Sequence, residues 1–136
     1  MKDTLTVGST IKKRYDVTKD NTIGFMGDDL RVYSTPSMVM NVEQTCRDLM
    51  VEHADEGEDS VGARVEIDHL GPTLNGMWVE VSAKVVEIDG PRVVFEAEVH
   101  DALDKVGQCR HTRFAVEKAR QKGRLEKKAA RLKETC

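Results

Sequence analysis

The spacing of apolar residues changes abruptly after His53, and this change constrains the fold more than any other feature of the sequence. Between Thr35 and His53 apolar residues recur at helical spacing, and at about 100° per residue they cluster on one face. Its members include Val39, Val42, Cys46, Leu49 and Met50. Beyond an acidic turn at residues 55–59, apolar and polar residues alternate instead, as in half-buried strands. One helix followed by alternating strands predicts an α+β domain whose antiparallel sheet buries one face against that helix.

Five segments are predicted to be strands. They are residues 11–17, 61–67, 77–85, 93–99 and 106–116. In the second strand, the face expected to contact the helix carries Val61, Ala63, Val65, Ile67 and His69. The run Asp89-Gly90-Pro91 predicts a hairpin between the third and fourth strands. The last strand is less regular, because polar residues share a face with its apolar ones; they are Gln108, Arg110 and Thr112.

The start of the helix is predicted from local chemistry. Thr35 is a plausible N-cap, and Pro36 follows at a position where the missing N–H costs nothing. Capping alone is therefore a sufficient explanation for a threonine at this position.

Composition narrows the class of protein. The 136 residues suit one domain, and an aromatic content of 4% means that its core is mainly aliphatic. The uncharged stretches at residues 32–42 and 70–79 fall short of the roughly 18 apolar residues that span a bilayer. No apolar segment precedes the basic cluster at residues 12–14, so a secretory signal is not expected. We therefore expect a cytoplasmic protein without a membrane partner.

The cysteines and histidines do not predict a metal site or a disulfide framework. Cys46, Cys109 and Cys136 are an odd number without CxxC spacing, which favours a reducing compartment. His100 and His111 lack the HxxxH or HxH spacing of common metal ligands. Neither a GxGxxG motif nor a P-loop is present, so no cofactor is expected.

Charge is divided unevenly along the chain. From Glu117 onward eight basic residues face three acidic ones, so this end carries a net charge of +5 and residues 1–116 carry −8. An acidic body argues against nucleic acid as the main partner. Strong helix formers dominate residues 119–133, which predicts a helix. We divide the chain into a domain of residues 1–118 and a basic helical tail of residues 119–136, which is either simply solvated or binds an anionic partner.

Two polar side chains are expected near the face that joins helix and sheet. Glu43 lies at the edge of the apolar helix face, where it either reaches the rim of the core or lines a cleft as a catalytic carboxylate. His69 continues the alternation of the second strand, so it faces the helix, as either a hydrogen-bonded core-edge residue or a functional one. Neither residue identifies a function by itself.

Their spacing, however, matches a known family. The run from Ser34 to Glu43, with Thr and Glu eight residues apart, followed by Gly62 and His69, resembles the fluoroacetyl-CoA thioesterase-like branch of the hotdog-fold thioesterases. The resemblance extends from about residue 7 to residue 118 and includes the pattern Gly107, His111, Arg113 in the last strand. It implies a hotdog fold, in which an antiparallel sheet wraps a helix, and a homodimer whose subunits join their sheets.

The resemblance also implies functional residues. Thr35, Glu43 and His69 would be catalytic, while Gly62 would line the acyl site and Arg113 would bind substrate. A glycine without a side chain lets an acyl group approach the backbone, although a bulge is an equally good reason for Gly62.

The N-terminus of the helix is a candidate oxyanion site. Pro36 has no N–H, so the expected donors are the amides of Ser37 or Met38, or that of Gly62 from the strand.

The activity that this resemblance implies is hydrolysis of a small or short-chain acyl-CoA. Either His69, oriented by Glu43, activates the Thr35 hydroxyl, or Glu43 attacks directly or activates water. Fluoroacetyl selectivity is not implied, because Phe25 is the only phenylalanine in the segment before Thr35. The alternative is a non-catalytic hotdog module that binds an acyl-CoA or a related ligand. If the basic tail binds an anionic partner, that partner would be CoA phosphate, RNA or an acidic protein.

Overall fold

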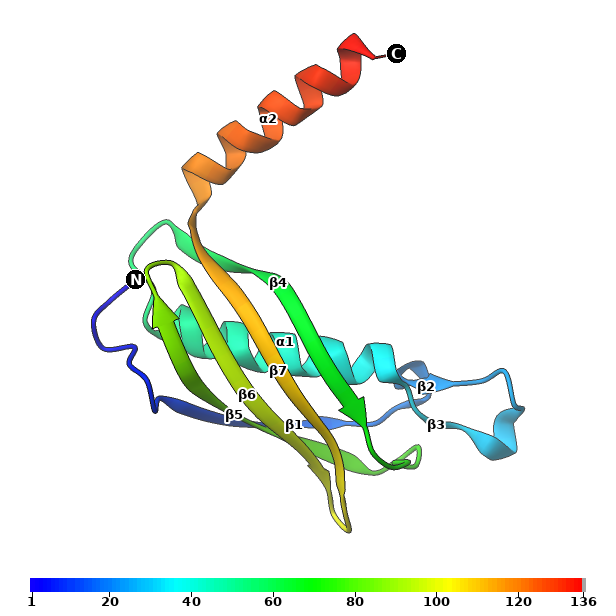
Figure 1. The fold of residues 1–136 in the computed structure, drawn as a ribbon. Helices are drawn as coiled ribbons and strands as arrows, with labels where there is room; N and C mark the ends of the chain where they lie inside the picture. The colour runs from blue at the N-terminus through cyan, green and yellow to red at the C-terminus, as the bar shows by residue number, and fades with distance from the viewer. Residues whose placement is uncertain (136) are drawn as a thin grey trace.

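A five-stranded antiparallel sheet and a long helix form the body of the computed structural model, which describes residues 1–135 (Figure 1). The sheet order is β1 (Thr10–Asp16), β5 (Trp78–Asp89), β6 (Arg92–Asp101), β7 (Lys105–Glu117) and β4 (Glu58–His69). Helix α1 (Thr35–Glu52) lies across one face of this sheet, and helix α2 (Lys118–Glu134) continues from β7. The predicted α+β architecture and the order of one strand, one helix and four strands are thus confirmed.

The sequence patterns did not predict a small element before α1. Two strands of two residues, β2 (Thr22–Ile23) and β3 (Val32–Tyr33), pair as a small antiparallel sheet. A short 3-10 turn precedes each strand, at Lys19–Asn21 (η1) and Asp28–Leu30 (η2). Strands of two residues are too short to produce a recognisable alternation.

The core lies between α1 and the inner face of the sheet. The helix contributes a buried aliphatic stripe that includes Met38, Val42, Cys46, Leu49 and Met50. The alternating residues of β5 and β6 face it, namely Val79, Val81, Ala83, Val85, Val93, Phe95, Ala97 and Val99. Burial of this apolar area, at roughly 25 cal/mol per Å², fixes the helix on the sheet and so fixes the ends of α1 relative to β4.

The helix begins at Thr35, one residue earlier than predicted. Ser34 is the N-cap, and its hydroxyl oxygen accepts the amide hydrogen of Ser37 at 3.2 Å. Thr35 is the first helical residue, so the prediction that it caps the helix is wrong. Serine caps a helix as well as threonine does, and its presence leaves the Thr35 hydroxyl available for another partner.

Strand β4 contains a bulge that changes which of its residues face the helix. Gly62 pairs with Arg113 and Arg64 pairs with Thr112, so Ala63 is the extra residue. Ser60 before the bulge is buried, whereas Val65 and Ile67 pack against the core after it. The prediction that Val61 and Ala63 face the helix is therefore wrong, because one extra residue reverses the alternation.

Strand β7 directs polar side chains inward. Its buried residues include Cys109, His111 and Arg113, whereas Gln108 and Arg110 are exposed on the face away from α1. The polar residues that made this strand irregular thus belong mostly to the outer face. The inner histidine and arginine are the unusual feature.

Both edge strands of the sheet are bonded on one side only, β1 to β5 and β4 to β7. Helix α2 has no buried residue and extends away from the body (Figure 1). Within residues 1–135, no helix is long and apolar enough to cross a membrane.

The identity of the cap gives a first testable prediction. Ser34→Ala should lower the free energy of unfolding by about 1 kcal/mol, because an amide of the first turn loses its acceptor. Thr35→Ala should lower it by less than Ser34→Ala does, since this exposed side chain caps nothing and loses only its hydrogen bond to His69. Denaturant unfolding of both variants measures the difference, and an equal loss in both would contradict the assignment.

Candidate active site

Thr35 and His69 meet where α1 begins and β4 ends. The Thr35 hydroxyl oxygen lies 2.8 Å from Nδ1 of His69. The Tyr33 ring packs edge-on against the imidazole, with 6.2 Å between the ring centroids, and its hydroxyl donates a hydrogen bond to Asn41. The hydroxyl and imidazole therefore form a hydrogen-bonded pair of the kind that a nucleophile and its base require, with an aromatic neighbour on one side of the ring.

The environment of His69 favours its neutral form. Partial burial lowers the pKa of the imidazole below its usual value, and the backbone of Gly71 opposes this effect. At neutral pH the ring is uncharged, and the tautomer with its proton on Nε2 has Nδ1 free to accept the hydroxyl proton of Thr35. This is the form that a general base requires.

A pocket of about 430 Å³ opens beside this pair. Thr35 and His69 are part of its wall, and most of the remaining wall is apolar. The apolar contributors are Ile23, Phe25, Val32, Leu70 and Pro72. Pockets of this size and composition hold small ligands and orient them through a few polar groups.

A second polar cluster lies further along α1, between the helix and β4. A Cβ added to Gly62 would lie 3.1 Å from Oε1 of Glu43, 3.3 Å from Cε1 of His111 and 3.5 Å from Nη1 of Arg113. A carboxylate, an imidazole and a guanidinium therefore converge on a residue without a side chain. Any larger residue at position 62 would occupy the space between them.

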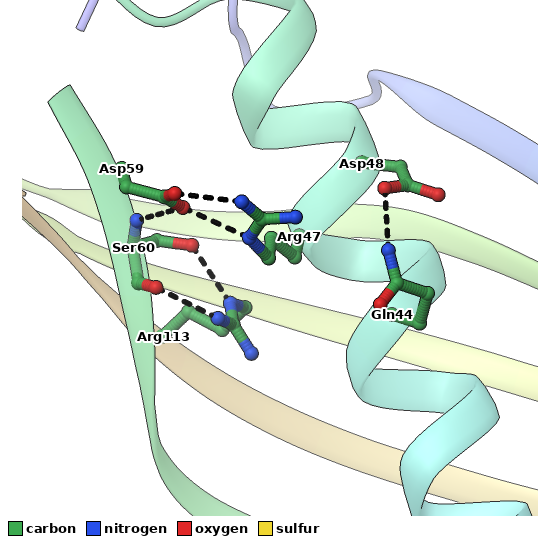
Figure 2. A network of polar contacts seen from close by, with 6 residues as sticks. All are labelled: Gln44, Arg47, Asp48, Asp59, Ser60 and Arg113. Atoms are coloured by element: carbon green, nitrogen blue, oxygen red, sulfur yellow. Dashed lines mark hydrogen bonds and ion pairs between the residues drawn. The ribbon is translucent and has the colours of Figure 1, made fainter. Parts of the chain in front are cut away.

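The hydrogen bonds of this cluster fix its proton positions. The Arg113 guanidinium donates to the hydroxyl and the carbonyl oxygen of Ser60, each at 2.9 Å (Figure 2). Nδ1 of His111 lies 2.8 Å from the carbonyl oxygen of Arg64, so this nitrogen carries the proton. Nε2 is then the acceptor for Arg113, 3.3 Å away. Burial lowers the pKa of both His111 and Arg113, so His111 is neutral at pH 7 while the guanidinium keeps its charge.

An ion pair attaches the beginning of β4 to α1. Nε and Nη2 of Arg47 donate to the two carboxylate oxygens of Asp59 at 3.0 and 2.7 Å (Figure 2). The same carboxylate accepts the amide hydrogen of Ser60 at 2.7 Å. These bonds lower the pKa of Asp59 and hold Ser60 where Arg113 binds it.

The two clusters are separate within one chain. Among residues 1–135, no hydrogen bond or ion pair joins Glu43 to Thr35 or His69, although Thr35 and His69 contact each other. Eight residues of α-helix correspond to roughly 12 Å along the axis, which separates Glu43 from Thr35. The chain thus assembles two of the three predicted catalytic residues and places the third beside Gly62 and Arg113.

The expected amide donors at the start of α1 are already engaged. The Ser37 amide binds the Ser34 hydroxyl, and the Met38 amide donates to the Ser34 carbonyl oxygen at 3.0 Å. The Met38 side chain is fully buried. Neither amide is free in this structure, so Gly62 and Arg113 are the better-placed candidate substrate contacts, and the roles of Ser37 and Met38 stay predictions.

A larger hollow, of about 1110 Å³, lies on the face of the sheet away from α1. Most of its charged lining residues pair with one another or with neighbours, as Arg110 does with Glu96 and Lys105 with Glu98. The bonded Thr35–His69 pair and the Glu43 cluster both face the helix side instead. We therefore place the chemistry at the smaller pocket.

Comparisons with known proteins show which proteins this chain resembles. A family model described as fluoroacetyl-CoA-specific thioesterase matches residues 17–119. A fluoroacetyl-CoA thioesterase of Streptantibioticus cattleyicolor is 26% identical over 123 residues, which are 85% of this chain and 88% of that protein. The residues that the family model matches include every candidate site residue.

Solved structures share the fold. A thioesterase superfamily member of Thermus thermophilus has a TM-score of 0.87 and 28% identity, over 95% of this chain and 96% of that one. A hot-dog-like protein of Thermanaerovibrio acidaminovorans has a TM-score of 0.82 and 24% identity, over 90% of this chain and 91% of that one. The predicted hotdog fold is confirmed by these similarities.

Burial of His111 predicts a dependence of stability on pH. Its pKa is lower in the folded protein than in the unfolded chain, where it is about 6.5, so the unfolded state binds more protons in acid. The free energy of unfolding should be constant above pH 7 and decrease on acidification to pH 5.5, because the unfolded state takes up a proton on His111 more readily than the folded state. Denaturant unfolding at each pH checks this. In His111→Gln the decrease should be smaller than in wild type, and an unchanged decrease would contradict the assignment.

Proposed function

Because this chain belongs to the fluoroacetyl-CoA-specific thioesterase family, we propose that it hydrolyses a small or short-chain acyl-CoA to the free acid and CoA. The observation that carries this proposal is the hydrogen bond between Thr35 and His69 at the wall of a small, mainly apolar pocket. It pairs a hydroxyl with a neutral imidazole at the place where an acyl group would lie. The two buried free thiols, Cys46 and Cys109, fit the cytoplasmic location that we also propose.

The chemistry of a thioester suits these residues. The leaving thiol has a pKa of about 8.5, so it departs as a thiolate with little assistance from an acid. The main tasks are to deliver a nucleophile to the carbonyl carbon and to stabilise the oxyanion that forms. In one route His69 removes the proton of Thr35 as the hydroxyl attacks, and water later releases the acyl group. In the other route Glu43 attacks or activates water while Thr35 and His69 position the carbonyl.

A homodimer would reunite the separated clusters. β4 exposes an unpaired edge, and two copies of an edge strand pair antiparallel about a two-fold axis. A pairing centred on the middle of β4 sets the Gly62 end of one strand beside the His69 end of the other. Glu43, Gly62 and Arg113 of one subunit then approach Thr35 and His69 of its partner, so that each dimer has two complete sites.

The roles within this shared site follow from the chemistry of each group. Arg113 carries a positive charge that its bonds to Ser60 hold in place, which suits an oxyanion or a carboxylate product. Gly62 leaves room for the acyl carbonyl between Arg113 and Glu43. The apolar pocket wall selects weakly among acyl chains, because one methylene contributes only about 1 to 3 kcal/mol.

The proposal is tested by measuring release of free CoA from a panel of acyl-CoA thioesters with short, branched, aryl and long acyl groups. Wild type should act on a small or short-chain substrate. Thr35→Ala and Glu43→Gln should each lower kcat by about 10²- to 10⁴-fold, because each removes a reacting or activating group. Glu52→Gln, which neutralises another carboxylate of α1, serves as the control and should match wild type.

The outcome also separates the enzyme from a binding module. A folded protein that releases CoA from no thioester, yet binds acyl-CoA in calorimetry, would contradict hydrolysis and support the non-catalytic alternative. Full activity in Glu43→Gln would contradict the role of that carboxylate.

The lowered pKa of His69 predicts the pH profile. A base acts in its neutral form, so kcat/KM should rise with pH and reach its plateau after an inflection below the usual histidine value of about 6.5. Initial rates from pH 5 to 8, in buffers of constant ionic strength, measure the inflection. An inflection above 7 would contradict the assignment of His69 as the neutral base.

A further inference from the structure

Five of the eight basic residues of helix α2 lie on one side of it. Five cations recur at helical spacing and lie within an arc of about 100°, which we call the basic stripe. The basic stripe consists of Arg120, Arg124, Lys127, Lys128 and Arg131. The two glutamates of the helix, Glu126 and Glu134, lie outside this arc.

The basic stripe has no counterpart in its own chain. All five side chains are exposed, and within residues 1–135 none of them takes part in an ion pair. Several of them are four residues apart, and like charges at that spacing destabilise a helix. Helix stability therefore does not explain the pattern, whereas an anionic ligand would.

The position of α2 indicates which anion. Glu117, the residue before the helix, pairs with Glu58 at the beginning of β4, and Figure 1 shows α2 leaving the body at that end. In the antiparallel dimer proposed above, this end of β4 lies beside the partner's His69. Helix α2 of one subunit thus projects next to the pocket of the other, where the thioester is hydrolysed.

The geometry points to the basic stripe as the site that binds the phosphate groups of the CoA nucleotide while the acyl end occupies the partner subunit's pocket. This inference rests on the proposed function. The pantetheine arm of CoA separates the thioester from the nucleotide, so the phosphates lie outside the pocket, where α2 projects. Arginine suits this role, because its guanidinium binds phosphate oxygens in pairs.

The helix supplies a matched pair of variants for the test. The stripe variant carries Arg124→Gln and Arg131→Gln, whereas the control variant carries Lys122→Gln and Lys133→Gln on the other side of α2. Both lose two positive charges. Kinetics are measured with a CoA thioester and with the N-acetylcysteamine thioester of the same acyl group, which has no nucleotide.

We expect the stripe variant to raise KM for the CoA thioester about three- to tenfold with little change in kcat, since exposed ion pairs are individually weak. The KM for the N-acetylcysteamine thioester should not change, and the control variant should resemble wild type. Added salt should reduce the difference between wild type and the stripe variant.

The other outcomes separate the two proposals. If wild type hydrolyses neither thioester, the proposed function fails and this inference fails with it. If wild type hydrolyses the CoA thioester and the stripe variant keeps its KM, or if stripe and control variants change equally, only the inference about α2 is overturned. If the stripe variant loses binding to an RNA oligonucleotide but keeps the wild-type KM for the CoA thioester, the inference is overturned in favour of a nucleic-acid partner.

Discussion

The bulge at Ala63 is the constraint on which the candidate active site depends. Gly62 and His69 are seven residues apart, and in a regular strand such residues point to opposite faces. The extra residue in β4 reverses the alternation between them, so both face α1. Without the bulge, either the imidazole would leave Thr35 or the glycine would leave Glu43. A local irregularity in one strand thus lets β4 place Gly62 beside Glu43 and His69 beside Thr35.

The polar contacts around the bulge explain how this irregular strand keeps its place. Arg47 and Asp59 join the start of β4 to α1, and Arg113 binds Ser60 from the neighbouring strand. Each group has a partner, and no buried side-chain nitrogen or oxygen within residues 1–135 lacks one. This matters because an unpaired buried polar group costs about 1 to 3 kcal/mol. The network therefore positions Ser60 and Arg113 without an exposed loop.

Much of this could be predicted from the sequence, for identifiable reasons. The aliphatic stripe of α1 and the alternation in β5 and β6 are periodic over many residues, so their structure and buried faces were predicted correctly. Thr35, Glu43 and His69 were identified as a set by their spacing and resemblance to a family. The faces of β4 were predicted incorrectly at Val61 and Ala63, because alternation does not reveal an inserted residue. Whether the amides of Ser37 and Met38 are free depends on which residue caps the helix. Ser34 and Thr35 are adjacent and both are good caps, so the sequence pattern does not decide between them.

The central claim is that each active site combines Thr35 and His69 of one subunit with Glu43 of the other. Its most direct test is the activity of a heterodimer isolated through two different affinity tags, one chain carrying Thr35→Ala and the other Glu43→Gln. One of its two sites then has all three residues, so the account predicts about half the wild-type activity from two inactive parents. A heterodimer of Thr35→Ala and His69→Gln chains should stay inactive, because those residues act from the same subunit. Absence of activity in the first heterodimer would contradict the shared site.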